Sequence, residues 1–218
     1  MALTWGWLEV AALLGMAWAG LLRPAEAVEA HREDLTLPSD TFLALEFVLV
    51  SIQEPKTRLR AARHKAGRVD PPDIVRLIEL AFAKWPARSR LWPYSSAAFR
   101  TRFEQLGNAL GLPVERSFGP FRPLDLGSLR AGGATDLYLS TENPALVQRR
   151  GRWVSAKVMD VYIQEVSAFT FYSKIDKVII EKITDLASLF PEVLVHVQHF
   201  ITAGIPRALW HQCLSAPG

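Results

Sequence analysis

The segment that most constrains the fold is an apolar run near the N-terminus, residues 10–22 (VAALLGMAWAGLL). Signal peptides, membrane anchors and buried helices all have this composition, so these three structures have to be compared. No basic residue precedes the run, Glu9 separates it from the apolar residues before it, and its 13 residues are fewer than the roughly 20 of a bilayer-spanning helix. We therefore predict a helix that ends near Gly20 and is buried in the core, with export or membrane anchoring as the alternative.

The overall composition is that of a globular chain. Half of the 218 residues are hydrophobic and 22% are charged, which suffices for one domain with a sizeable core. The net charge is +3 and the isoelectric point is about 9.2, values that permit a nucleic-acid partner without requiring one. A single cysteine, Cys213, excludes an internal disulfide and a cysteine-rich zinc site, and it favours a reducing compartment.

Apolar patterns and turn residues predict an α+β fold that is mainly helical and contains a small antiparallel sheet. Residues 43–52 (LALEFVLVSI) and 63–69 have the composition of two strands of a hairpin, and prolines at 55, 71 and 72 mark their ends. Serines at 95, 96 and 155 and prolines at 72 and 144 are placed to begin helices. We expect the helix capped at 155 to carry Tyr162, and a further helix to span about residues 175–189.

Residues 127–162 contain three residue types that phosphodiester chemistry requires together. Arg130 is followed by four small residues, Trp153 closes a Gly-Arg-Trp turn, and Tyr162 follows Trp153 by nine positions. An arginine can grip two phosphate oxygens, an indole N–H can donate to another, and a phenol can attack phosphorus to form a covalent intermediate. Tryptophan and tyrosine are also ordinary core residues, so the prediction rests on the combination.

This segment resembles the C-terminal catalytic boxes of the tyrosine recombinases, the phage integrase family. The family pattern is His-x-x-Arg, then Gly-His or Gly-Arg-Trp, then a tyrosine; Gly127 stands where the family has the histidine. Residues 19–26 (AGLLRPAE) are similar to the first arginine box, which makes Arg23 the catalytic arginine and Glu26 the supporting acidic residue. The resemblance covers about residues 10–165 and implies the fold of the family's catalytic domain.

The resemblance implies a role for each matching residue. Arg23 and Arg130 would hold the phosphate, and Trp153 would donate its indole N–H to a non-bridging oxygen. Tyr162 would attack and keep the 3′ phosphate, whereas Lys56, on the expected hairpin, would protonate the departing 5′ oxygen. Such a reaction needs no metal and no other cofactor, and the sequence contains no Walker loop.

Two clusters of cationic residues predict contacts with the phosphates of double-stranded DNA. One cluster lies on the expected hairpin, and the other leads into the Gly-Arg-Trp turn. Clusters of this kind are also common on solvated surfaces. The predicted DNA-binding residues are Arg58, Arg60, Arg63, Lys65, Arg68, Arg149, Arg150 and Arg152.

We expect residues 1–165 to form the catalytic domain and residues 166–218 a helical tail, which either docks on a second protomer or packs on its own domain. The DNA-clamping domain that normally precedes the catalytic domain in the family is expected to be absent. The resemblance implies a soluble, DNA-associated enzyme of the nucleus or nucleoid, not secreted, that cleaves and rejoins strands in recombination or integration. The missing histidine and clamp leave a second interpretation open, a catalytically impaired DNA-binding remnant of a mobile-element recombinase.

Overall fold

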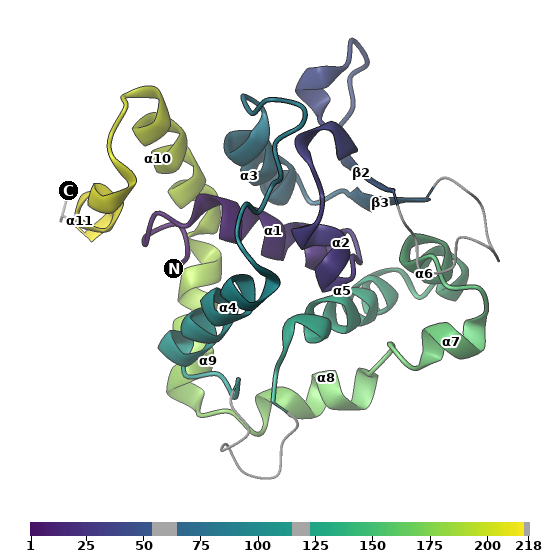
Figure 1. The fold of residues 1–218 in the computed structure, drawn as a ribbon. Coiled ribbons are helices and arrows are strands. Elements are labelled where there is room, and N and C mark those ends of the chain that lie inside the picture. The colour runs from purple at the N-terminus through teal and green to yellow at the C-terminus, as the bar shows by residue number, and fades with distance from the viewer. Residues whose placement is uncertain (54–64, 115–122, 216–218) are drawn as a thin grey trace.

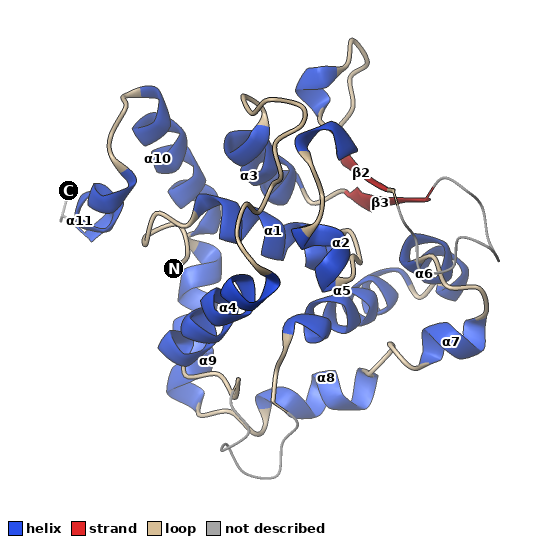
Figure 2. Ribbon diagram, in the orientation of Figure 1, coloured by secondary structure: helices blue, strands red, loops and turns tan. Residues whose placement is uncertain are grey.

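The computed structural model describes residues 1–53, 65–114 and 123–215, which are mainly helical (Figures 1 and 2). The predicted class, mainly helical with a small antiparallel sheet, is confirmed. The helices of the described residues are α1 (Leu8–Ala19), α2 (Pro24–Val28), α3 (Pro72–Phe82), α4 (Ser96–Leu110), α5 (Leu126–Thr141), α6 (Pro144–Gly151), α7 (Ala156–Asp160), α8 (Glu165–Tyr172), α9 (Lys177–Ser188), α10 (Phe190–Thr202) and α11 (Trp210–Ser215), with short 3-10 turns at Arg32–Asp34, Pro38–Asp40 and Arg207–Leu209.

Helix α1 occupies the centre of the molecule and packs against both α3 and α5 (Figure 1). Its side chains are apolar on nearly every face, and Leu8, Leu13 and Met16 are fully buried. A helix that is apolar all round is stable in water only when other elements cover it. The predicted buried helix is therefore confirmed, and its end at Ala19 agrees with the expected stop at Gly20. No described helix is both long and apolar enough to span a membrane.

The sheet has three antiparallel strands in the order β1 (Leu35–Thr36), β2 (Val48–Ile52) and β3 (Lys65–Val69). Val48, Val50 and Ile52 alternate toward the core, as expected for a strand with one buried face. The sequence predicted β2 and β3 but missed β1, and it placed the start of β2 at residue 43. Strand β2 begins only at Val48 because that residue pairs with Val69, the last residue of β3.

Side-chain caps fix the starts of the helices that carry the candidate site. Asp125 accepts a hydrogen bond from the backbone N–H of Ser128 at the start of α5, and Ser155 caps α7. The prediction that a helix carries Tyr162 is wrong, because α7 ends at Asp160. The Thr135 hydroxyl accepts from the Gln164 N–H (3.0 Å), and its single proton is shared between the Ala131 carbonyl (2.9 Å) and the Tyr162 carbonyl (3.2 Å). A continued helix would have paired the Gln164 N–H and the Tyr162 carbonyl internally.

The segment after residue 165 packs mostly on the same chain. Helix α9 lies against α4, and α10 lies against α3. Four residues of α10 and α11 are buried in the same core as α1 and the sheet: Leu194, Val197, Phe200 and Trp210. Helices α10 and α11 therefore pack on their own domain, which is one of the two arrangements expected for the tail. The core continues across the expected domain boundary at residue 165.

A second, smaller apolar cluster lies where α5, α6 and α7 meet. It contains Leu21, Ala134, Val147, Trp153 and Met159, and Tyr162 packs against it. This cluster holds two of the predicted catalytic side chains, so the packing of these three helices determines their positions.

Candidate active site

Four of the five predicted catalytic residues come together from segments that are far apart in the sequence. Arg23 precedes α2, Arg130 is in α5, Trp153 follows α6, and Tyr162 follows α7. Helices α2, α5 and α6 lie in the same part of the molecule in Figure 1. Lys56, the fifth, lies outside the described residues, and its role stays a prediction.

Glycines allow the closest approaches in this region. A Cβ atom at Gly133 of α5 would lie 2.1 Å from the Trp18 carbonyl oxygen, so α5 packs directly on the end of α1 that leads to Arg23. A Cβ atom at Gly151 would lie 1.7 Å from the Trp153 ring. Gly133, among the small residues after Arg130, lets α5 approach α1, and Gly151 of the Gly-Arg-Trp turn leaves space for the Trp153 ring.

Arg130 is a buried cation with unused hydrogen-bonding capacity. Its side chain is 2% exposed, and Nη2 donates to the Gly151 carbonyl at 2.6 Å. Nε and Nη1 are buried without a partner, as is the indole Nε1 of Trp153. A buried donor left unpaired costs about 1–3 kcal/mol, more when it is charged. These donors would be satisfied by an acceptor such as a phosphate oxygen.

Aromatic rings cover the guanidinium of Arg130. Its Cζ lies 5.0 Å from the ring centroid of Trp153 and 5.3 Å from that of Tyr162, and the two ring centroids are 4.8 Å apart. These distances fit cation–π contacts, which hold all three side chains in one group. Because Nε and Nη1 are fully buried, a phosphate can reach them only when the covering side chains shift, and the Tyr162 ring is one of them.

Glu26 links two further arginines to the group. Its carboxylate accepts from Arg23 Nη1 (2.6 Å), from the Arg23 backbone N–H (2.8 Å) and from Arg152 Nη2 (2.9 Å). Burial alone would raise the pKa of Glu26, but the charge of Arg152 and the hydrogen bonds from Arg23 outweigh it and lower the pKa. Glu26 is therefore ionised at neutral pH and holds both arginines.

The electrostatic field of the site is positive. Three guanidinium groups, those of Arg23, Arg130 and Arg152, face one carboxylate, that of Glu26, which leaves two positive charges in excess. Burial, with the charges of Arg152 and Arg23, lowers the pKa of Arg130 to about 10. Burial also lowers the pKa of Arg152, against the attraction of Glu26. An anion placed here would reduce the repulsion among the arginines.

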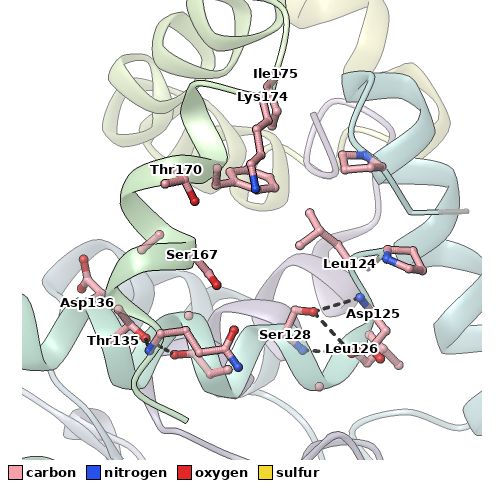
Figure 3. Close-up of a pocket in the computed structure, with 18 of the residues that line it drawn as sticks. Leu124, Asp125, Leu126, Ser128, Thr135, Asp136, Ser167, Thr170, Lys174 and Ile175 are labelled. Carbon is pink, nitrogen blue, oxygen red and sulfur yellow. Dashed lines mark hydrogen bonds between the residues drawn. The ribbon is translucent and has the colours of Figure 1, made fainter. Parts of the chain in front are cut away.

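A cavity of about 1150 Å³ adjoins the group and is bordered by Tyr162, the start of α5, α8 and the end of α4. In Figure 3, Ser167 and Lys174 extend from the α8 side toward Leu124–Ser128 on the opposite wall. Gly127, which the resemblance aligns with the family's histidine, is exposed and lines the same cavity as Tyr162. A side chain at residue 127 would therefore enter the space that the Tyr162 segment borders.

The predicted DNA-binding residues have different environments. Arg68 pairs with Asp70 (2.7 Å) and lies over the Phe47 ring, and Arg150 also pairs with Asp70 (2.8 Å). Arg149 is exposed. Arg152 was predicted to face DNA phosphates, but its side chain is only 8% exposed and bonds inside the protein. Lys65 is in β3, whereas three predicted residues lie outside the described part: Arg58, Arg60 and Arg63.

No protein-family model and no curated protein matches this chain. The resemblance described above therefore rests on the residues themselves.

Sequence reasoning missed two residues that hold the site in place. Thr135 fixes the backbone on both sides of residue 163 through the hydrogen bonds described above. Gln148 donates from Nε2 to the Trp153 carbonyl at 3.2 Å and accepts from the Trp153 N–H at 3.1 Å. Thr135 acts on a turn 27 residues later that only the fold brings to it, whereas Gln148 acts on the turn that follows its own helix.

Proposed function

We propose that this chain carries the catalytic domain of a tyrosine recombinase, which cleaves and rejoins DNA strands through a covalent 3′-phosphotyrosine. One observation carries the proposal: Arg23, Arg130, Trp153 and Tyr162, predicted from separate motifs, lie in one positively charged group that contains unpaired buried donors.

In the proposed reaction the scissile phosphate lies between Arg23 and Arg130, whose charges stabilise the pentavalent transition state. The Nε and Nη1 of Arg130 and the Nε1 of Trp153 supply hydrogen bonds that they otherwise lack. Tyr162 gives its phenolic proton to water and its oxygen attacks phosphorus. The bond from phosphorus to the 5′ oxygen breaks, and Lys56 gives that oxygen a proton. Attack by a new 5′ hydroxyl on the phosphotyrosine reverses these steps.

A suicide substrate tests this proposal. It is a duplex with a nick close to the cleavage position. The short fragment that carries the new 5′ hydroxyl then diffuses away, so the phosphotyrosine accumulates. A protein–DNA adduct that survives denaturation is the expected result. The Tyr162→Phe variant removes only the phenolic oxygen and keeps the ring against Trp153 and Arg130. It should bind DNA as the natural chain does and form no adduct; adducts in this variant would exclude Tyr162 as the nucleophile.

Gly127 favours a second candidate function, a DNA-binding remnant with impaired catalysis. Glycine has no side chain to hydrogen-bond the phosphate or to move the tyrosine proton, and the cavity at this position is open. The remnant would bind DNA with the salt dependence of a basic surface but form adducts slowly or not at all. The suicide substrate separates the two candidates by the rate of adduct formation.

A further inference from the structure

Arg152 lies where three segments of the candidate site meet. Its Nη2 donates to the Leu21 carbonyl and to Glu26 Oε2, both at 2.9 Å. Its Nη1 donates to the Gly20 carbonyl at 3.2 Å and to the Arg150 carbonyl at 3.3 Å. One side chain thus ties the turn that carries Arg23 to the turn that carries Trp153.

The third segment is strand β3. A Cβ atom at Gly67 would lie 2.6 Å from Leu22 Cδ2, 3.0 Å from the Gly20 carbonyl oxygen and 3.5 Å from Arg152 Nη1. The strand therefore rests directly on the turn that Arg152 binds.

The backbone at residue 152 gives independent support. Arg152 has φ of +60°, in the left-handed region that favours glycine, where it ends α6. Leu21, whose carbonyl it binds, also has a positive φ of +50°. The Arg152 side chain therefore joins two non-glycine residues whose backbones both have an unfavourable positive φ. Its hydrogen bonds hold these two backbone conformations against their local preference.

We propose that Arg152 is a positioning residue of the recombinase site. This inference rests on the proposed function. Through Glu26 it fixes Arg23, and through its own backbone it sets the turn that begins with Trp153. It touches neither DNA nor the attacking tyrosine. Its effect on cleavage comes from the spacing between Arg23, Arg130 and Trp153, and a small displacement of such groups costs up to about 100-fold in rate.

The test compares Arg152→Met, Arg152→Lys and Arg152→Gly with Arg88→Met, which removes an exposed arginine elsewhere. Single-turnover adduct formation is measured at saturating protein, and DNA affinity is measured at the same salt concentration. We expect the three variants at residue 152 to cleave about 10- to 100-fold more slowly, with affinity changed less than about twofold. Arg88→Met should match the parent in both measurements. Affinity that falls in step with cleavage would overturn the proposal, because Arg152 would then be a phosphate contact.

Chemical rescue separates positioning from a general loss of stability. Arg152→Gly favours the left-handed backbone and leaves a space shaped for guanidinium, so added guanidinium chloride at low, non-denaturing concentration should restore cleavage. It should not restore Arg152→Met, whose side chain fills the space. Because Arg152 holds Arg23 through Glu26, the double variant Glu26→Gln/Arg152→Met should lose less than the sum of the two single losses. Additive losses, or no rescue of a folded Arg152→Gly, would contradict the proposal.

Failure of the proposed function can be told apart from failure of this inference. If neither the natural chain nor Gly127→His forms an adduct, the recombinase proposal is wrong. The role of Arg152 is then measured by the rise in melting temperature that inorganic phosphate causes when it binds the arginines. Arg152→Met should weaken this rise, Glu26→Gln should weaken it as well because it also frees Arg23, and Arg88→Met should keep it. A larger rise in Glu26→Gln would mean that Arg152 binds phosphate directly and that the inference is wrong. An undiminished rise in Arg152→Met would overturn the inference, whatever the adduct assay gives.

Discussion

Replacing Gly127 with histidine is expected to accelerate adduct formation. Residue 127 is exposed at the second position of α5 and lines the cavity that Tyr162 borders. A Cβ atom there meets only the Asp125 side chain, with Oδ1 at 3.0 Å and Cγ at 3.9 Å. A shift of a few tenths of an ångström in that capping carboxylate makes room, so the variant should fold.

The expected magnitudes follow from the same geometry. Histidine is favoured over glycine in a helix by up to about 0.5 kcal/mol, whereas a protonated imidazole near a helix start costs about 0.3–1 kcal/mol. Stability should therefore change by less than about 1 kcal/mol. General acid–base assistance contributes about 10²–10⁴ in rate, and an imidazole placed without an optimised surrounding should give at least about tenfold. Tenfold corresponds to about 1.4 kcal/mol of transition-state stabilisation.

The assay is single-turnover adduct formation on the nicked substrate between about pH 5.5 and 8, the range in which an ordinary imidazole with pKa near 6.5 titrates. Gly127→Ala adds the Cβ atom alone, and Gly132→His places an imidazole elsewhere on the same cavity wall. Only Gly127→His should be faster and show a pH inflection. A natural chain as fast as Gly127→His, or an equal gain in Gly132→His, would mean that residue 127 is not the histidine position and that the alignment of residues 127–135 is wrong.

Three other perturbations address the buried cation, the hairpin and the tail. Arg130→Met should abolish adducts. Burial lowers the pKa of Arg130 to about 10, so below that pH its buried charge destabilises the folded state. This destabilisation is relieved as the pH rises from about 10 toward the usual pKa of arginine. Urea denaturation should therefore show the natural chain gaining stability relative to Arg130→Met only above about pH 10, and a constant difference would refute the burial argument. Replacing Arg58, Arg60 and Arg63 together should reduce the slope of log affinity against log salt by about 3, since each phosphate contact contributes about 0.9, and an unchanged slope would place them on a solvated face. Truncation after Glu165 should cause aggregation, because it removes Leu194 and Trp210 from the main core, and Leu194→Ala alone should cost about 2–5 kcal/mol; a soluble, monomeric truncated chain would contradict this.

Local chemistry allowed much of the fold to be predicted from the sequence. The apolar run after Glu9 had to be buried, and α1 is the central helix. Ser95 and Ser155 begin helices because their hydroxyls accept a backbone N–H three residues later, and Gly111 ends α4 because glycine accepts a positive φ. Each of these features depends on a few neighbouring residues, so no knowledge of distant contacts was needed.

Predicting the candidate site requires both the sequence and the tertiary structure. The sequence supplied the identity and order of Arg23, Arg130, Trp153 and Tyr162, but nothing in it requires these residues to meet. Their meeting depends on the approach of α5 to the end of α1 at Gly133 and on the space that Gly151 leaves for the indole. The buried, unpaired donors of Arg130 follow from that packing and could not be read from the motif.

Arg152 marks the limit of sequence reasoning for this protein. Beside Arg149 and Arg150 it has the pattern of a DNA-binding cluster, and pattern alone assigns all three the same role. The structure separates them, because Arg152 reaches carbonyl groups and a carboxylate more than 100 residues earlier in the chain. The same is true of Tyr162, which lies outside its expected helix and bonds to Thr135, and of Leu194, Val197, Phe200 and Trp210 in the tail, which are buried in the core around α1. Sequence patterns determine which side chains are available and which elements form locally, whereas burial and pairing depend on partners that only the folded chain brings into contact.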